Sequence, residues 1–236
     1  MLAFQYHPDI LTDFPAVVGG VLLVRDLQNG ATPDPLRSIY LTEQESVRAK
    51  IGNTPLSELE SLAAWRAAFR NFGVNPTKYR SAVEALLRRL TKKGDIPSIN
   101  TLVDICNLVS IRYQLPVAAF DVRSVRCPIT VCYAQGTEMF YPLGVTEAEH
   151  PEAGEVIFAD EDQLVVARRW CWRQSNESAA REDTTAAIFT IESQHDGGKS
   201  SVESALADLD ELLNDYAEAG ERIKGVLTNE RAKISY

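Results

Sequence analysis

Histidine is scarce in this chain, and the common signatures of catalytic and cofactor sites are missing. The 236 residues include three histidines, His7, His150 and His195, all in expected loops or near an end of the chain. There is no HExxH motif, zinc-ligand spacing, nucleophile elbow, P-loop or dinucleotide-binding glycine motif. These absences argue against the common metallohydrolase, serine-hydrolase and nucleotide-binding classes. The sequence predicts no cofactor and no bound metal.

The chain also lacks paired cysteine motifs and long apolar runs. Its four cysteines show no CxxC spacing, so we expect reduced core residues, including Cys171, which lies beside arginines but has no histidine partner. No apolar run reaches the roughly 18 residues of a membrane span. The opening MLAFQYHPDI lacks the basic and apolar regions of a signal peptide. We expect a cytoplasmic protein without membrane contact, and the sequence predicts no particular oligomeric state.

Charge is unevenly distributed along the sequence. The net charge of −9 argues against broad nonspecific binding of nucleic acid. Residues 138–162 contain eight acids and residues 203–221 contain seven, with no Lys or Arg in either segment. Residues 78–93 instead contain six bases and one acid, which fits an anionic partner docking there; the alternative is a set of solvated helix faces. The candidate RNA-binding residues are Lys78, Arg80, Arg88, Arg89, Lys92 and Lys93.

Hydrophobic periodicity places most helices before most strands. Expected helices cover residues 43–50, with Thr42 and Glu45 as a capping box, and then 58–73 after the cap Ser57, 77–93, 98–114 and 201–219. Expected strands cover residues 14–25, 117–122, 129–134, 138–141, 156–159, 164–174 and 187–193, with a short strand or tail near 223–227. The predicted class is α+β, with helices packed on a largely antiparallel or mixed sheet.

We expect one domain over residues 1–236. Its parts are a strand-helix part at 1–75, a motif region at 79–192 and a C-terminal helix at 201–219.

The helix expected at 98–114 carries polar side chains on the flank of its apolar stripe. Asn100, Asp104 and Asn107 follow at spacings of four and three, so they share a face. Asparagine is a poor residue for a helix interior. These side chains form a pocket wall in one interpretation; in the other they cap neighbouring loops, with Asn100 serving the helix N-terminus.

The strand expected at 164–174 carries an unusual set of arginines and tryptophans. Alternation places Arg168, Trp170, Trp172 and Gln174 on one face and the residues between them on the other. Adjacent arginine and tryptophan side chains suit a base or another aromatic ring through stacking and charge. Alternatively, this is an edge strand whose arginines pair with the acids at 160–162.

Several separated motifs in the right order carry a family resemblance. They are Pro97-Ser98-Ile99-Asn100, Asp104 with Asn107, Leu115-Pro116 before Ala119-Phe120-Asp121, Gly154-Glu155 with Asp160, and RRWCWRQ at 168–174. Residues 79–192 resemble the B3/B4 module of the phenylalanyl-tRNA synthetase β-subunit, in its free-standing bacterial form. The resemblance implies a B3/B4-like fold. No synthetase catalytic domain and no anticodon-binding region accompanies it.

The resemblance also implies a function. In the synthetase this module is an editing site that hydrolyses tyrosine wrongly attached to tRNA. A free-standing copy is expected to act in trans as an aminoacyl-tRNA deacylase on the charged acceptor end. The alternatives are a noncatalytic module that binds tRNA, other RNA or an amino acid, and a hydrolase or sensor of small amino-acid derivatives.

Two positions depart from the synthetase pattern. Ala118 stands where the synthetase has a histidine. The glutamate of its last strand matches best near Thr190, with Glu192 two residues further on. Either another amino acid is recognised, or catalysis is lost and binding remains.

An ester to a ribose hydroxyl is already activated, so positioning a water and stabilising the oxyanion suffices for hydrolysis. The catalytic candidates are Asn100, Asn107 and Glu138, with the asparagines orienting the amino acid or the water. Glu138 or Glu155 would bind the α-amino group, the arginines the terminal adenosine or a phosphate, and a tryptophan would stack on a ring. The substrate-binding candidates are Asp104, Glu155, Arg168, Arg169, Trp170, Trp172, Arg173 and Gln174.

Overall fold

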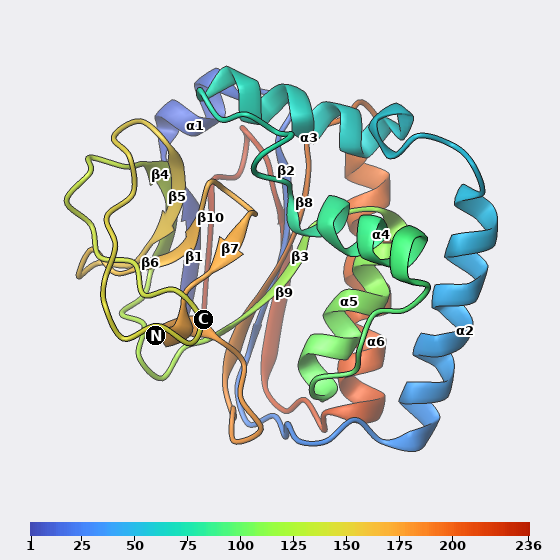
Figure 1. The fold of residues 1–236 in the computed structure, drawn as a ribbon. Helices are drawn as coiled ribbons and strands as arrows, with labels where there is room; N and C mark the ends of the chain where they lie inside the picture. Colours follow the sequence, from blue (N-terminus) through green and yellow to red (C-terminus); the bar gives the residue numbers. More distant parts are fainter.

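Helices and strands of this chain gather into distinct layers in the computed structural model, which describes residues 1–236 (Figure 1). None of the helices is both long enough and apolar enough to cross a membrane. The helices are α1 (Pro8–Asp13), α2 (Asp34–Ile51), α3 (Glu60–Asn71), α4 (Ala82–Lys93), α5 (Thr101–Tyr113) and α6 (Gly198–Tyr216), with short 3₁₀ turns η1 (Leu56–Glu58) and η2 (Asn176–Ser178).

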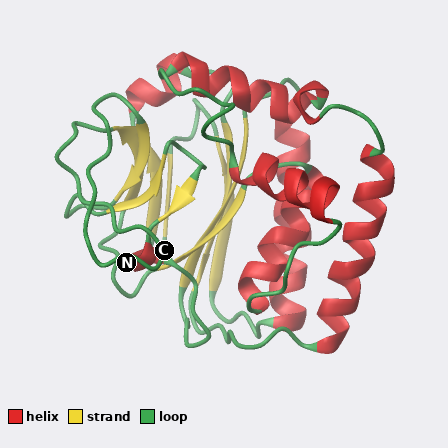
Figure 2. Cartoon of the chain, viewed as in Figure 1, coloured by secondary structure: helices red, strands yellow, loops and turns green.

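The strands form two sheets (Figure 2). The four-stranded sheet is antiparallel and has the order β3 (Val117–Asp121), β8 (Ala187–Ser193), β2 (Val18–Val24), β9 (Arg222–Leu227). The six-stranded sheet has the order β10 (Lys233–Ser235), β1 (Ala3–Tyr6), β4 (Ile129–Tyr133), β5 (Val156–Ala159), β6 (Val165–Arg168), β7 (Arg173–Gln174). It is mixed because β1 runs parallel to β4 and the other pairs are antiparallel. The predicted α+β class is confirmed.

The four-stranded sheet lies between the helices and the second sheet (Figure 1). On β2, Leu22 and Val24 pack in the core that includes α2, α4, α5 and α6. Val21 and Leu23 point the other way, into the core shared with the six-stranded sheet. This alternation explains why β2 is apolar without interruption, since both of its faces are buried.

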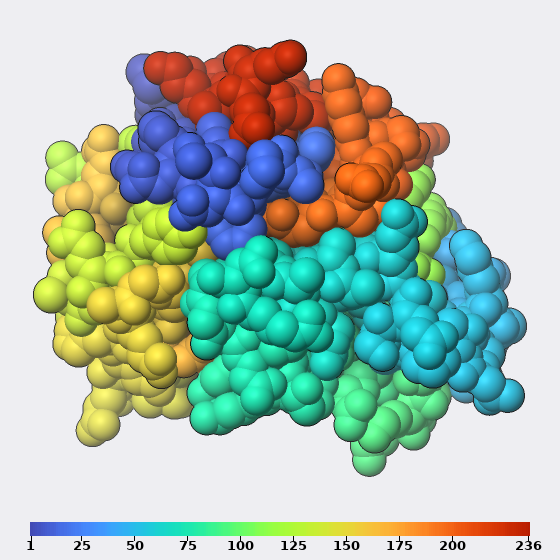
Figure 3. All heavy atoms as spheres, turned by 90° about the horizontal axis from the view of Figure 1, so that it is seen from above, coloured from blue at the N-terminus to red at the C-terminus, as the bar shows by residue number.

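α3 closes the top of the molecule, beside the N-terminal segment (Figure 3). Its buried residues Trp65 and Phe69 belong to the core between the sheets. Trp65 meets Trp170 edge-on, with ring centroids 5.4 Å apart. An element from the first half of the chain thereby supports the region that carries the sequence motifs.

Local signals explain where the two central helices begin and end. Ser81 caps α4 by accepting a hydrogen bond from the Glu84 backbone N–H, and Gly94 ends it in the left-handed conformation, with φ of 89°. Asn100 caps α5 in the same way, through the Val103 N–H. The predicted end at Gly94 is confirmed, whereas α4 begins later than residue 77.

Strands β3, β4, β5, β8 and β9 confirm the predictions for their segments within one or two residues, and β5 and β8 match to the residue. The predicted capping box at Thr42 is wrong, because α2 already begins at Asp34 and the Thr42 hydroxyl bonds the Ser38 carbonyl inside it. The Ser57 cap is also wrong: Ser57 lies in the 3₁₀ turn η1, and α3 starts after it.

The expected strand at 138–141 is wrong as well. Met139 and Phe140 make only isolated bridges, to Leu164 and Glu149, within an irregular segment. Strands β1 and β10 and helix α1 were not predicted, because they are short and lie near the ends of the chain.

Candidate functional site

The segment expected as one strand at 164–174 folds back on itself. β6 ends at Arg168, β7 begins at Arg173, and these two residues are register partners in an antiparallel pair. Arg169 and Trp170 lie between them with φ of 45° and 61°, in the left-handed region. Two successive left-handed residues reverse the chain, so the predicted alternation of faces along this segment is wrong.

The reversal buries Trp170 completely. Its ring packs edge-on against Phe14 and Trp65, with centroid distances of 4.9 and 5.4 Å. Its indole N–H donates a 3.0 Å hydrogen bond to Glu192. Trp170 therefore forms an internal wall, and its ring is not open to stacking on a base.

Arg168 and Glu155 bind each other. The Arg168 Nε and Nη2 donate to the two carboxylate oxygens of Glu155 at 2.8 and 3.0 Å, and both side chains are buried. Nη1 of Arg168 reaches Glu149 at 3.0 Å. These two substrate-binding candidates are thus joined in a bidentate ion pair away from any hollow.

Arginines and aromatic rings stack at the surface beside this pair. The guanidinium carbon of Arg169 lies 3.9 Å from the ring centroid of Tyr79 and 4.6 Å from that of Trp172. Arg173 lies 4.6 Å from the same Trp172 ring. Arg169 is buried, whereas Arg173 is exposed and Trp172 is half-buried. Arg173 and the exposed parts of Trp172 and Tyr79 can therefore meet a ligand, whereas Arg169 is covered.

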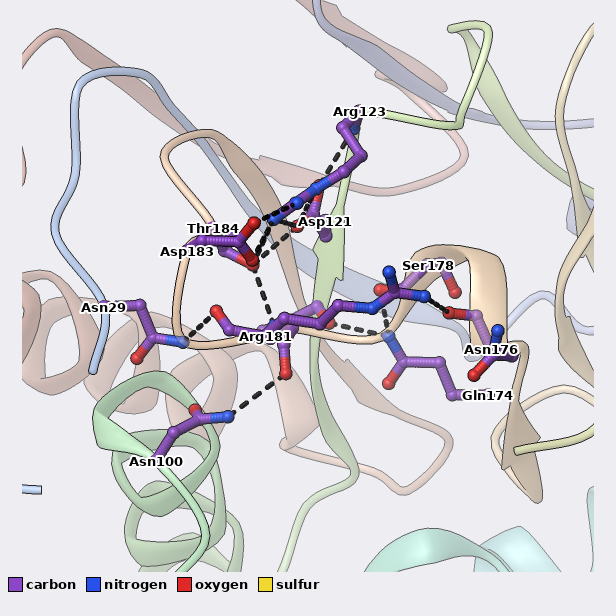
Figure 4. A network of polar contacts seen from close by, with 12 residues as sticks. Asn29, Asn100, Asp121, Arg123, Gln174, Asn176, Ser178, Arg181, Asp183 and Thr184 are labelled. Carbon is purple, nitrogen blue, oxygen red and sulfur yellow. Dashed lines mark hydrogen bonds and ion pairs between the residues drawn. The ribbon is translucent and has the colours of Figure 1, made fainter. Parts of the chain in front are cut away.

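Asn100 and Gln174 both hydrogen-bond to the loop at 176–184 (Figure 4). Asn100 caps α5 with its oxygen and donates its amide N–H to the Ala180 carbonyl at 3.1 Å. Gln174 donates to the Ala119 and Ser178 carbonyls at 2.8 and 2.6 Å. Both amides stabilise this loop, and Gln174 also lines a hollow that is described below.

Asp104 is fully buried under the N-terminus of α5. It accepts hydrogen bonds from the Thr32 hydroxyl at 2.6 Å, from the Ile99 N–H at 2.9 Å, and from the Ser98 hydroxyl. These contacts tie α5 to the segment before α2. Asp104 lies apart from the hollows.

Glu138 lies apart from the other candidates. Its carboxylate accepts backbone N–H groups of Gln135, Gly136 and Thr137 at 2.7 to 3.1 Å. Burial favours the neutral carboxyl, but these donors outweigh it and hold the pKa of Glu138 below its usual value. Glu138 organises a turn on the far side of the six-stranded sheet, beside His7 and Cys132.

A hollow of about 90 Å³, closed at its inner end and open at its mouth, lies between the two sheets and is called the closed hollow below. Its inner walls are the buried residues Phe120, Phe158, Trp170, Thr190 and Glu192, and its mouth is formed by the more exposed Trp172, Arg173 and Gln174. Ala118 and Thr190 are register partners on β3 and β8 and both line it. The two positions at which the synthetase pattern has histidine and glutamate therefore meet in this hollow.

Glu192 is the one carboxylate in this lining. It is 2% exposed and accepts hydrogen bonds from the Tyr6 hydroxyl at 2.6 Å and from Trp170 at 3.0 Å. Burial raises the pKa of Glu192 to about 7, against the opposing effect of these two donors. A carboxyl that titrates near neutral pH can exchange a proton or a hydrogen bond with a ligand in the hollow.

An apolar groove of about 410 Å³ adjoins the hollow between α4, α5 and β3. Asn107 and Arg89 are its principal polar side chains, and Ala118 and Gln174 belong to both linings. Of the polar candidates on α5, only Asn107 reaches a hollow.

A basic groove of about 490 Å³ continues from there along α4. It shares Ala85 and Arg89 with the apolar groove, and Trp172 and Arg173 with the closed hollow. Arg88, Lys92 and Lys93 make no ion pair within the chain. All six candidate RNA-binding residues line this groove: Lys78, Arg80, Arg88, Arg89, Lys92 and Lys93.

The family profile of the B3/4 domain matches residues 64–207, more than half of the chain. The chain belongs to the B3/4 domain family. The match includes every residue that lines the closed hollow and both grooves. No curated protein matches the chain.

A solved structure similar to this B3/4 protein is an N-terminal fragment of the phenylalanyl-tRNA synthetase β-subunit from Pyrococcus horikoshii. The two share 12% identity with a TM-score of 0.47, over 94% of this chain and 54% of that one. This chain thus spans about half of the solved fragment.

The sequence interpretation missed Tyr6. It lies outside the B3/4 match, yet its hydroxyl reaches the Glu192 carboxylate across 186 positions of sequence. The only local signal is the alternation of AFQY, in which Phe4 and Tyr6 are buried. Nothing in that pattern links the strand to the hollow.

Proposed function

We propose that this B3/4 protein binds the aminoacylated acceptor end of a tRNA and hydrolyses its ester in trans. The observation that carries the proposal is the continuity of three hollows of different character. The closed hollow shares lining residues with the apolar groove, and each of them shares lining residues with the groove lined by six basic residues. An acceptor end likewise joins an amino acid, a flat nucleoside and a chain of phosphates.

Each part of the ligand has a matching surface. The basic groove supplies Arg88, Lys92 and Lys93, whose charges are free to neutralise phosphates. The apolar groove takes the terminal adenine, with the Asn107 amide available to its polar edge. The aminoacyl group enters the closed hollow, which places its ester near the shared residues Ala118 and Gln174.

The chemistry requires one water and no covalent nucleophile. The water adds to the ester carbonyl, and the intermediate expels the ribose hydroxyl, giving free amino acid and uncharged tRNA. Asn107 and Arg173 border the place where the ester would lie, so they are the candidates to orient water and oppose the oxyanion. Asn100, Asp104, Glu138, Glu155 and Arg168 have structural roles in this proposal and none in catalysis, because their polar atoms are held by the chain itself.

A noncatalytic tRNA-binding role is the second candidate. It is favoured by Ala118 and Thr190, which replace two ionisable groups of the synthetase pattern with side chains that cannot act as acid or base at neutral pH. The basic groove serves binding equally well in either case.

The test is release of amino acid from a panel of correctly and wrongly charged tRNAs. We expect fast release from a subset of species, reduced about 10-fold or more in Asn107→Ala and in Arg173→Ala. Lys199→Ala is the matched control, because Lys199 is exposed on α6 away from the grooves. Binding without release from any species would favour the second candidate, and absence of both would refute the proposal.

A further inference from the structure

The closed hollow is small. Its volume of about 90 Å³ is bounded by Phe120, Phe158 and Trp170, each at most 2% exposed. A benzene molecule occupies an engineered apolar cavity of about 150 Å³ in another protein. A phenyl or phenol ring therefore exceeds this volume and would extend out through the mouth, whereas a side chain of a few atoms fits inside.

The closed end also has a polar atom that no group of the chain contacts. Tyr6 and Trp170 both donate to Oε1 of Glu192. Oε2 has no hydrogen-bond partner within the chain, although the residue lines the hollow and is 2% exposed. Oε2 is not among the fully buried atoms of the chain, so it can be reached from the hollow. A ligand that covers it without supplying a donor would leave a carboxylate oxygen unpaired, which is unfavourable.

The neighbours fix which oxygen faces the ligand. An indole N–H can only donate, so the oxygen beside Trp170 must remain an acceptor. Oε2 is left to face the hollow, and the ring contacts around Trp170 hold this arrangement in place.

We infer that the hollow selects an aminoacyl group whose side chain is short and carries a hydroxyl or thiol, with Oε2 of Glu192 as the acceptor. This inference rests on the proposed function, since it names the substrate class for the same site. Serine, threonine and cysteine meet both conditions. Alanine meets only the size condition, and tyrosine meets only the polar one.

The size and polarity of the hollow predict different preferences. A site with a buried acceptor discriminates strongly against an analogue that lacks the donor, because the acceptor is then left unpaired. We expect seryl esters to be preferred over alanyl esters by about 10- to 100-fold in kcat/KM. Phenylalanyl and tyrosyl esters are expected to be poorer than alanyl esters, because their rings do not enter.

Two measurements on the full chain test the inference. The first compares kcat/KM for seryl-, cysteinyl-, alanyl- and tyrosyl-tRNA. The second compares dissociation constants of amide-linked seryl and alanyl analogues of the charged 3′ adenosine, which cannot be hydrolysed. Glu192→Gln serves as the variant: its amide oxygen must accept from Trp170, so its NH2 group faces the hollow as a donor.

In wild-type protein, a seryl-over-alanyl preference in either measurement supports the inference, and its loss in Glu192→Gln assigns it to this residue. Equal seryl and alanyl values, or a preference for tyrosine, overturn the inference while hydrolysis itself upholds the proposed function. Absence of hydrolysis with a seryl preference in the amide analogues refutes only the deacylase activity. Absence of both hydrolysis and analogue binding refutes both.

Discussion

Ala118 and Thr190 are register partners across β3 and β8, and together they form one wall of the closed hollow. A methyl group on one strand thus faces a short hydroxyl-bearing side chain on the next. The wall carries no charge, and the one carboxylate in the lining, Glu192, comes two residues later on β8.

Filling the hollow should separate its role from that of the basic groove. Ala118→Leu adds three carbon atoms at a half-buried position in the lining. We expect amino-acid release to fall at least about 10-fold, because the aminoacyl group is excluded, while tRNA affinity changes less than about 2-fold. Release assays and filter binding on the same preparation measure both quantities. Equal losses of release and affinity would contradict the separation of the two sites.

Removing charges from the basic groove should change the salt dependence of tRNA binding. Arg88 and Lys92 are exposed and make no ion pair within the chain. Each single alanine variant is expected to weaken binding of all tRNAs and to lower the slope of log K against log salt concentration by about 1. Binding titrations at several salt concentrations give the slope. An unchanged slope in the double variant, equal to that of Lys199→Ala, would remove the groove from the binding surface.

The buried carboxyl of Glu192 should make stability depend on pH. Its pKa is raised to about 7, so the folded chain binds one more proton than the unfolded chain between its ordinary value of 4.5 and about 7. The free energy of unfolding therefore falls as pH rises through this window, by about 3 kcal/mol from this group. Tyr6 and Cys171, which face it, stay neutral there because burial raises the pKa of each well above its ordinary value.

Denaturant unfolding of wild type and Glu192→Gln at pH 5 and pH 8 measures this contribution. The loss of stability between the two pH values is expected to be larger in wild type, and the difference between the proteins isolates Glu192. Parallel pH profiles would show that the carboxyl titrates in its ordinary range.

The ion pair of Arg168 and Glu155 is expected to matter for folding more than for substrate. Arg168→Met leaves a buried carboxylate with a weakened set of partners, which typically costs about 3 kcal/mol or more. The double variant with Glu155→Leu should recover part of that loss, because both charges are then gone. Unfolding measurements on wild type, Arg168→Met, Glu155→Leu and the double variant form a double-mutant cycle. A stable Arg168→Met protein with impaired release of amino acid from charged tRNA would instead place Arg168 in substrate binding.

Gly19 makes room for the side chain that holds Glu192. A Cβ built on Gly19 would collide with the hydroxyl of Tyr6 and touch its ring at 3.0 Å. Gly19→Ala is expected to destabilise the chain by about 1–3 kcal/mol through this overpacking. The same change in a Tyr6→Phe background should cost less, since the colliding oxygen is absent. Equal costs in the two backgrounds would mean that the ring moves aside freely.

The sequence predicted the central elements because their signals are local. The apolar alternation on β8 and the glycine that ends α4 act within a few residues. The hairpin at Arg169 and Trp170 was out of reach, because left-handed backbone at two non-glycine residues is imposed by tertiary contacts such as those of Trp170 with Phe14 and Trp65.

The sequence predicted several residues of the candidate site, but it did not predict how they are arranged. Asn107, Arg173 and the six basic residues line hollows. Spacing alone cannot distinguish Asn107 from Asn100, which caps the helix, since both lie on one flank of the same segment. The distinction depends on what the fold places beside each side chain. Asn100 meets a loop carbonyl, whereas Asn107 lines the apolar groove.

The hydrogen bond from Tyr6 to Glu192 has a consequence for the order in which the molecule can be assembled. Tyr6 is synthesised 186 positions before its partner. Until β8 emerges, the N-terminal strand has no acceptor for its hydroxyl and the hollow has no floor. A nascent chain thus contains the six basic residues at 78–93 well before it can hold an aminoacyl group, so incomplete products are expected to bind RNA without acting on it.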